Sequence, residues 1–180
     1  MNARHAAGRW GFDAHLRWPA GAVYSEPLFL DAADGGIKAA ASGDWEPAAQ
    51  RLRLDQWSID LHDTVQLSGL GRFAGAALTL QDLTVAAHSQ RSDRLYERLL
   101  QPFLIGSVVD DLQVEGQIGL ALHFDAEGIE QAGLELNRLA FEDRGGRFAL
   151  GNTTGSIAWD RRREAPLSRL AVDAASVYRI

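Results

Sequence analysis

The chain has 180 residues, of which 46% are hydrophobic and 23% charged, and its formal net charge is -6. This length suits a single domain large enough to bury a core, and the composition is unlike that of disordered proteins. The negative charge argues against nonspecific nucleic-acid binding, which needs a cationic surface. The lack of cysteine excludes disulfides, thiolate catalysis and cysteine-ligated metals.

Apolar and polar residues alternate along most of the chain, beginning with Trp10, Phe12, Ala14, Leu16 and Trp18. This period of two predicts a half-buried strand over residues 9–18. Similar patterns predict strands near 22–31, 36–42, 51–61, 65–73, 76–87, 109–124, 129–142, 147–159 and 167–179. Turn signals fall at 62–64, 125–128, 143–146 and 160–166. Such short connections favour an antiparallel meander.

The period changes between residues 91 and 105. Leu95, Leu99 and Phe103 lie four residues apart, and Ser92 or Asp93 could cap the start of a helix. The sequence therefore predicts one short amphipathic helix near 92–104. It divides a single β-rich segment, 1–180, into strands over 1–90, a helical connection over 91–105 and further strands over 106–180.

A hydrophobic pattern recurs in which two apolar pairs are separated by two residues. It is clearest in "ALTLQDLTVAA" (77–87) and "GLELNRLAFED" (133–143), and it also fits stretches that start at 52, 107 and 165. The two clearest copies contribute Leu78, Leu80, Leu83 and Val85, and Leu134, Leu136, Leu139 and Phe141. Spacings of this kind indicate a stacked array with about one hairpin per unit. Amphipathic strands without a true period are the alternative.

The central residues of the pattern change its phase, because odd and even positions of a flat strand face opposite ways. A β-bulge near Gln81 and Asp82 would return both apolar pairs to one face and increase the local twist. Repeated bulges predict a mainly β fold: a long antiparallel meander, twisted and curled into an open groove, with one short helix. A strand that crosses between two layers of a sandwich is the alternative.

The longest alternation, over residues 112–124, predicts a strand of roughly 40 Å. Its apolar residues share one face and are Leu112, Val114, Ile118, Leu120, Leu122 and Phe124.

No motif predicts catalysis. The five histidines lack metal-binding spacing, no GxSxG stretch occurs, and "GLGRFAG" (69–75) is not followed by a helical pattern that could hold a phosphate. We therefore predict no enzyme activity, no cofactor and no metal site. The five tryptophans either fill a core or line an apolar cavity. No run of about 18 apolar residues predicts a transmembrane helix, and no apolar segment predicts a signal peptide.

The repeats and the stretch "GRFALGNTTGSIAWDRRREAPLSRLAVDAASVYRI" resemble the AsmA-like bacterial envelope proteins, most closely their YdbH branch. The resemblance covers roughly residues 50–180. It implies an open β-groove of the bridge-like lipid transfer type, which carries phospholipid acyl chains through the periplasm. It also implies a longer protein, with an inner-membrane anchor outside this segment and possible envelope partners at the ends of the groove.

The expected function is thus passive lipid transfer, with no nucleic-acid partner. Acyl chains would contact Leu78, Leu80, Leu83, Val85, Leu112, Val114, Ile118, Leu120, Leu122, Phe124, Leu134, Leu136, Leu139 and Phe141. A structural envelope domain without a ligand is the first alternative, and a fragment of an outer-membrane barrel is the second.

Overall fold

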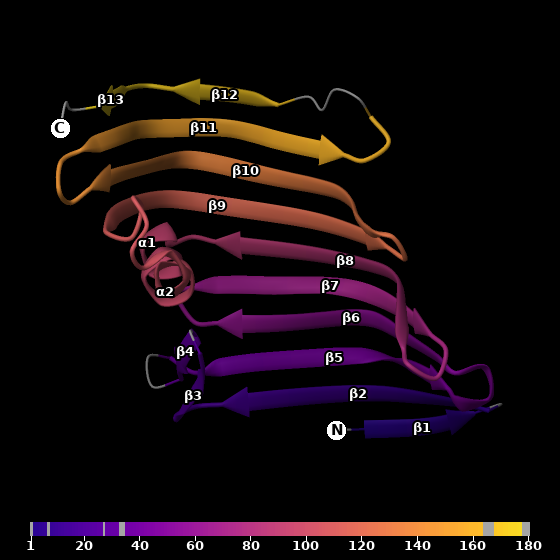
Figure 1. Ribbon diagram of the computed structural model, residues 1–180. Coiled ribbons are helices and arrows are strands. Elements are labelled where there is room, and N and C mark those ends of the chain that lie inside the picture. The colour runs from indigo at the N-terminus through magenta and orange to yellow at the C-terminus, as the bar shows by residue number, and fades with distance from the viewer. Residues whose placement is uncertain (1, 7, 27, 33–34, 164–167, 178–180) are drawn as a thin grey trace.

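The computed structural model describes residues 2–6, 8–26, 28–32, 35–163 and 168–177. Most of these residues form one antiparallel sheet, in which strands that follow each other along the chain lie side by side (Figure 1). The sheet is open, with β1 at one edge and both β12 and β13 beside β11 at the other. The predicted fold class, a mainly β antiparallel meander with one short helix, is confirmed.

The elements of the main sheet follow the order of the chain. They are β1 (Asn2–Ala6), β2 (Arg9–Trp18), β5 (Ile37–Glu46), β6 (Arg51–Leu61), β7 (Val65–Ala74), β8 (Thr79–Ser89), β9 (Leu112–Asp125), β10 (Gly128–Asp143), β11 (Phe148–Asp160), β12 (Arg169–Val172) and β13 (Ala175–Val177). A separate hairpin consists of β3 (Ala22–Ser25) and β4 (Leu28–Asp31), and the short 3-10 helix η1 (Pro47–Ala49) joins β5 to β6.

Two predicted strands are wrong in detail. The expected strand 22–31 is the hairpin β3–β4, and the sequence places Pro27 between its two halves, where proline cannot donate a ladder hydrogen bond. The expected strand 167–179 is interrupted between β12 and β13, and its residues 167, 178 and 179 lie outside the described residues. The strand β1 had not been predicted.

The bulge predicted near Gln81 is confirmed by the pairing of β7 with β8. Arg72 lies opposite Asp82, but the next residue, Phe73, lies opposite Leu80, so Gln81 is the extra residue. The inserted residue returns Leu80 to the face that carries Leu83 and Val85.

Equivalent irregularities occur in two other copies of the pattern. In β6, Leu54 and Trp57 lie opposite Gly71 and Gly69 of β7. Two residues of β6, Asp55 and Gln56, therefore face a single residue of β7. In β10, Arg138 and Leu139 lie across from Gly116 of β9. Because both halves of each strand stay in one sheet, the alternative of strands crossing between two layers is excluded for these copies.

The remaining two copies have different outcomes. Residues 107–111 precede β9, so the copy that starts at 107 is mostly a turn and its assignment to a strand was wrong. The copy that starts at 165 begins among residues 164–167, outside the described part of the chain.

The helix is composite and consists of α1 (Ser92–Leu95), the π-turn η2 (Tyr96–Leu100) and α2 (Gln101–Leu104). The range predicted for it is confirmed, but the predicted cap is wrong because no side chain caps its first turn. The hydroxyl of Ser92 instead donates to the carbonyl of Gly116 at 3.0 Å. Pro102 cannot donate a hydrogen bond into the preceding turn, and a π-turn immediately before it fits this loss.

The π-turn shifts the helical phase by one residue. Leu104, rather than Phe103, packs against the cluster of Tyr96, Leu112 and Val114. Phe103 is therefore turned outward, whereas a regular α-helix would place it on the same face as Leu95 and Leu99.

Candidate binding site: an uncovered apolar face

Residues directly opposite each other in an antiparallel sheet project to the same face. The apolar residues of neighbouring strands lie opposite each other from β2 to β11, so they form one continuous apolar face. Its large side chains are Trp10, Phe12, Leu16 and Trp18 (β2); Ile37 and Trp45 (β5); Leu52, Leu54, Trp57, Ile59 and Leu61 (β6); Val65, Leu67 and Phe73 (β7); Leu80, Leu83 and Val85 (β8); Ile118, Leu120, Leu122 and Phe124 (β9); Ile129, Leu134 and Leu136 (β10); and Ile157 and Trp159 (β11).

Most of this apolar face has no second layer over it. Among the described residues the buried hydrophobic side chains are Ala32, Val65, Tyr96, Leu112 and Val114. The accessible surface of the chain is 11837 Å², whereas a compact monomer of this mass exposes about 8,600 Å². The excess follows from a sheet that keeps its apolar side open.

All five tryptophans of the chain lie on the apolar face. Trp10 and Trp45 are directly opposite each other, Trp57 lies opposite Gly69, and Trp159 lies opposite Ala132. Trp18 is opposite Ile37 at the far end of β2. Trp10 and Trp159 remain 48% and 44% exposed. Of the two roles predicted for the tryptophans, the placement favours lining an apolar surface over filling a closed core.

One end of the apolar face is covered by the helix. Figure 1 shows α1 and α2 beside the end of the sheet where β8 ends and β9 begins. Tyr96 packs there against Leu112 and Val114. Its hydroxyl donates to the carbonyl of Val109 at 2.6 Å and accepts from the amide of Leu112 at 3.1 Å.

Buried hydroxyls complete the covered end. Ser89 donates to the carbonyl of Thr64 at 2.6 Å, and Ser92 donates to that of Gly116, so both buried polar groups are satisfied. The covered end is therefore a small packed core, and the rest of the apolar face extends from it along the strands.

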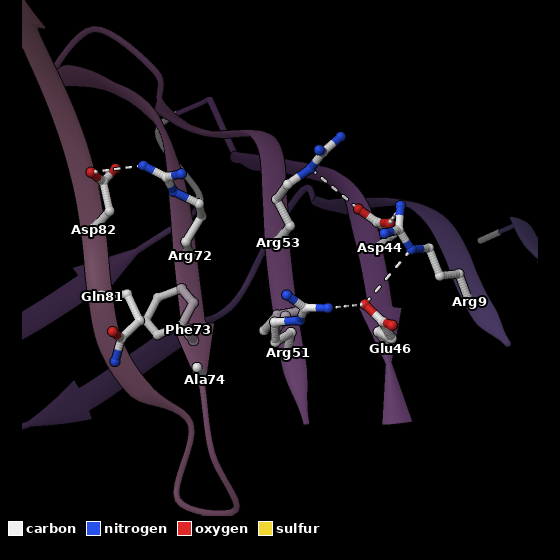
Figure 2. A pocket seen from close by; sticks show the side chains of 11 residues that line it. Arg9, Asp44, Glu46, Arg51, Arg53, Arg72, Phe73, Ala74, Gln81 and Asp82 are labelled. Atoms are coloured by element: carbon white, nitrogen blue, oxygen red, sulfur yellow. Dashed lines mark hydrogen bonds and ion pairs between the residues drawn. The ribbon is translucent and has the colours of Figure 1, made fainter. Parts of the chain in front are cut away.

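The opposite side of the sheet is polar and is defined by the residues that alternate with those of the apolar face. An open hollow of about 460 Å³ lies on this polar face. Figure 2 shows the side chains that line it. Each arginine drawn there has a carboxylate partner: Arg9 and Arg53 pair with Asp44, Arg51 with Glu46, and Arg72 with Asp82. Because positive and negative groups are interleaved, the hollow has no strong charge of either sign.

The ion pairs continue across the polar face from β8 to β10. Asp82 accepts from Arg72 and lies 3.3 Å from Nε2 of His123, whose Nδ1 lies 3.0 Å from Glu130. Although burial raises the pKa of Asp82, hydrogen bonds from His123 and Arg72 outweigh it and lower that pKa below its usual value. In the described part of the chain, no group of three or more histidine and acidic side chains could hold a metal ion.

The predicted lining residues separate into three groups. Leu80, Leu83, Val85, Ile118, Leu120, Leu122, Phe124, Leu134 and Leu136 lie on the open part of the apolar face. Leu112, Val114, Leu139 and Phe141 belong to the cluster under the helix, where protein side chains already contact them. Leu78 lies in the turn before β8, with a φ of 49° and 41% exposure, so strand pairing does not place it on this face.

Sequence reasoning missed the contribution of the first strands to the site. The sequence predicted the alternation of β2 and the copy of the pattern in β6, and it left their tryptophans open between core and cavity lining. It did not place the leucines of these strands on the lining. The register shows that β2, β5 and β6 extend the same face.

No protein-family model, no curated protein and no solved structure matches this chain. Of the helices that the structure describes, none combines the length and the apolar character needed to cross a membrane.

Proposed function

We propose that this chain is a lipid-binding segment of a bridge-like phospholipid transfer protein of the cell envelope. The observation that carries the proposal is the continuous apolar face, which spans the sheet and which the described residues cover at one end only. Acyl chains lying against it would replace the missing second layer. Each CH₂ group kept from water contributes about 0.8 kcal/mol, so one lipid binds without a specific headgroup contact.

The dimensions of the sheet support this proposal. The strands β9, β10 and β11 contain 14, 16 and 13 residues, which corresponds to roughly 40 to 50 Å. One leaflet of a bilayer is about 15 Å of hydrocarbon, so an acyl chain fits along a strand with room to move. Movement along a uniform apolar surface needs no energy source, and transfer would be passive.

The placement in the periplasm, an inner-membrane anchor beyond this segment and envelope partners rest on the resemblance to AsmA-like proteins. A structural envelope domain remains the second candidate, because another protein could cover the same apolar face.

Lipid capture tests the proposal directly. We expect lipid extracted from the purified protein to be identified by mass spectrometry, and phospholipids brominated on their acyl chains to quench tryptophan fluorescence, because all five tryptophans lie on the apolar face. The double variant Leu122→Gln/Leu134→Gln should capture several-fold less lipid. Ala121→Gln is the matched control, because Ala121 neighbours Leu122 but projects from the polar face. Absence of both lipid and quenching would exclude lipid binding and leave the structural domain.

A further inference from the structure

The segment from Leu99 to Val109 contains no charged residue, in a chain of which 23% is charged. Four of its large side chains point into solvent rather than onto the sheet: Leu100, Phe103, Ile105 and Val108, here called the apolar tip. Phe103, Ile105 and Val108 are 61%, 78% and 68% exposed. The π-turn explains the exposure of Phe103, because it gives the inward position to Leu104.

Three backbone amides around the apolar tip have hydrogen-bond partners within the same turn. The amide of Gly106 donates to the carboxylate of Asp110 at 3.0 Å, and that of Ser107 donates to the carbonyl of Leu104 at 2.9 Å. The amide of Val109 donates to the hydroxyl of Ser107 at 3.2 Å. A turn can enter a lipid interface at low cost only when its polar backbone groups already have partners.

Several charged side chains around the tip are paired with one another. Arg91 contacts Asp93 at 2.8 Å, and Arg144 contacts Glu97 and Asp111 at 3.8 and 3.4 Å. A second arginine, Arg147, holds the tip to the β10–β11 turn by donating to the carbonyl of Val108 at 3.2 Å. The tip is therefore fixed in position, and its rim offers little net charge to an anionic or cationic partner.

We propose that the apolar tip docks this end of the sheet onto the surface of a lipid bilayer by shallow insertion of Phe103, Ile105 and Val108. The exposed area of four side chains is on the order of 400 Å², well below the about 800 Å² per partner of a standard protein interface. Lipid has no such minimum, because each apolar group that leaves water contributes separately. The balanced rim favours contact with neutral as well as anionic headgroups.

This inference deepens the proposed function, on which its role in lipid delivery rests. The tip consists of the last turn of the helix and the turn that follows it, and the inner side of this helix packs on the covered end of the apolar face through Tyr96 and Leu104. A bilayer held at the tip would lie beside the surface that receives its lipids.

Flotation with phosphatidylcholine vesicles tests the contact. We expect the protein to float with the vesicles with little effect of salt, and the triple variant Phe103→Ser/Ile105→Ser/Val108→Ser to bind at least about tenfold more weakly. The control Val177→Ser removes a side chain that is 86% exposed at the sheet edge and should leave vesicle binding unchanged. Equal binding by the wild-type protein and the triple variant would overturn the proposal.

A fluorescent label gives an independent measurement, because the chain contains no cysteine. A polarity-sensitive dye on Ser107→Cys should shift to the blue when vesicles are added, and the same dye on Ala126→Cys, in the turn at the other end of β9, should not. Equal shifts at both sites, or a tip-dependent dimer without vesicle binding, would contradict bilayer docking.

The two proposals fail separately. Vesicle binding without capture of brominated lipid refutes the lipid-binding function alone. Capture of lipid without vesicle binding refutes the docking tip alone.

Discussion

Asp143 is the charged residue most completely enclosed in the described part of the chain, with 1% exposure. Arg147 contacts both of its carboxylate oxygens, from Nε at 3.0 Å and from Nη2 at 2.7 Å, and the Arg147 amide adds a third bond at 2.9 Å. These bonds, first of all those from the Arg147 side chain, lower the pKa of Asp143 to about 2. A single ion pair thus fixes both the β10–β11 turn and, through Val108, the apolar tip.

The lowered pKa predicts how acid affects this contact. A carboxylate whose pKa is lower in the folded state than in the unfolded chain stabilises the fold above the unfolded value, here 3.8. That stabilisation is lost as the pH falls toward about 2. The variant Asp143→Asn should therefore melt at a lower temperature than the wild-type protein at neutral pH. Thermal denaturation at several pH values should show the difference shrinking below pH 3.8. A difference that stays constant in acid would mean that the charge of Asp143 does not stabilise the turn.

At the scale of single elements, the bulges decide which side chains reach the apolar face. Gly116 shows the backbone requirement of one such bulge, since its φ is 109° and a Cβ at this position would lie 2.5 Å from the carbonyl oxygen of Arg138. Its own carbonyl accepts from Ser92, so the bulge in β10 and the start of the helix meet at this residue. No other residue type fits both the φ and the close approach.

The variant Gly116→Ala should lower the free energy of unfolding by roughly 1–3 kcal/mol, the usual cost of a strained backbone position. Chemical denaturation would measure the loss. Gly133→Ala is a suitable control, because nothing lies within 4 Å of a Cβ added there and its φ is not positive. Equal stability of the two variants would contradict the requirement for glycine in the bulge.

The elements also show how far sequence reasoning reaches. The alternation in β6 and β10 predicted their ranges closely, and the phase change at Gln81 predicted a bulge, because both follow from local periodicity. The phase of Phe103 could not be predicted, since the π-turn that rotates it outward leaves no signature in the spacing of leucines. The covering of Leu112 and Val114 is a tertiary contact with Tyr96, which periodicity does not encode.

For the whole molecule, the repeated bulges predicted an open sheet, but the alternation alone did not decide whether its apolar side would be covered. Alternating strands are equally compatible with a sandwich, in which a second sheet packs on the first. The order of strand pairing excludes a sandwich for the described residues of the main sheet, because successive strands extend one sheet. Most of the apolar face therefore has no covering layer among the described residues, and the lipid proposal rests on this arrangement.

The order of the strands has a further consequence, for how the molecule unfolds. Because most of the apolar face has no second layer in the described part of the chain, a strand such as β2 is held mainly by its two neighbours. Stability should therefore pass along the sheet as it does along an array of repeats. Such a sheet unfolds from its two edge strands toward its centre. Hydrogen exchange should be fastest in β1, β12 and β13 and slowest in β8, β9 and β10, where the helix adds contacts. Uniform protection across the sheet would show instead that the chain unfolds as a single cooperative unit.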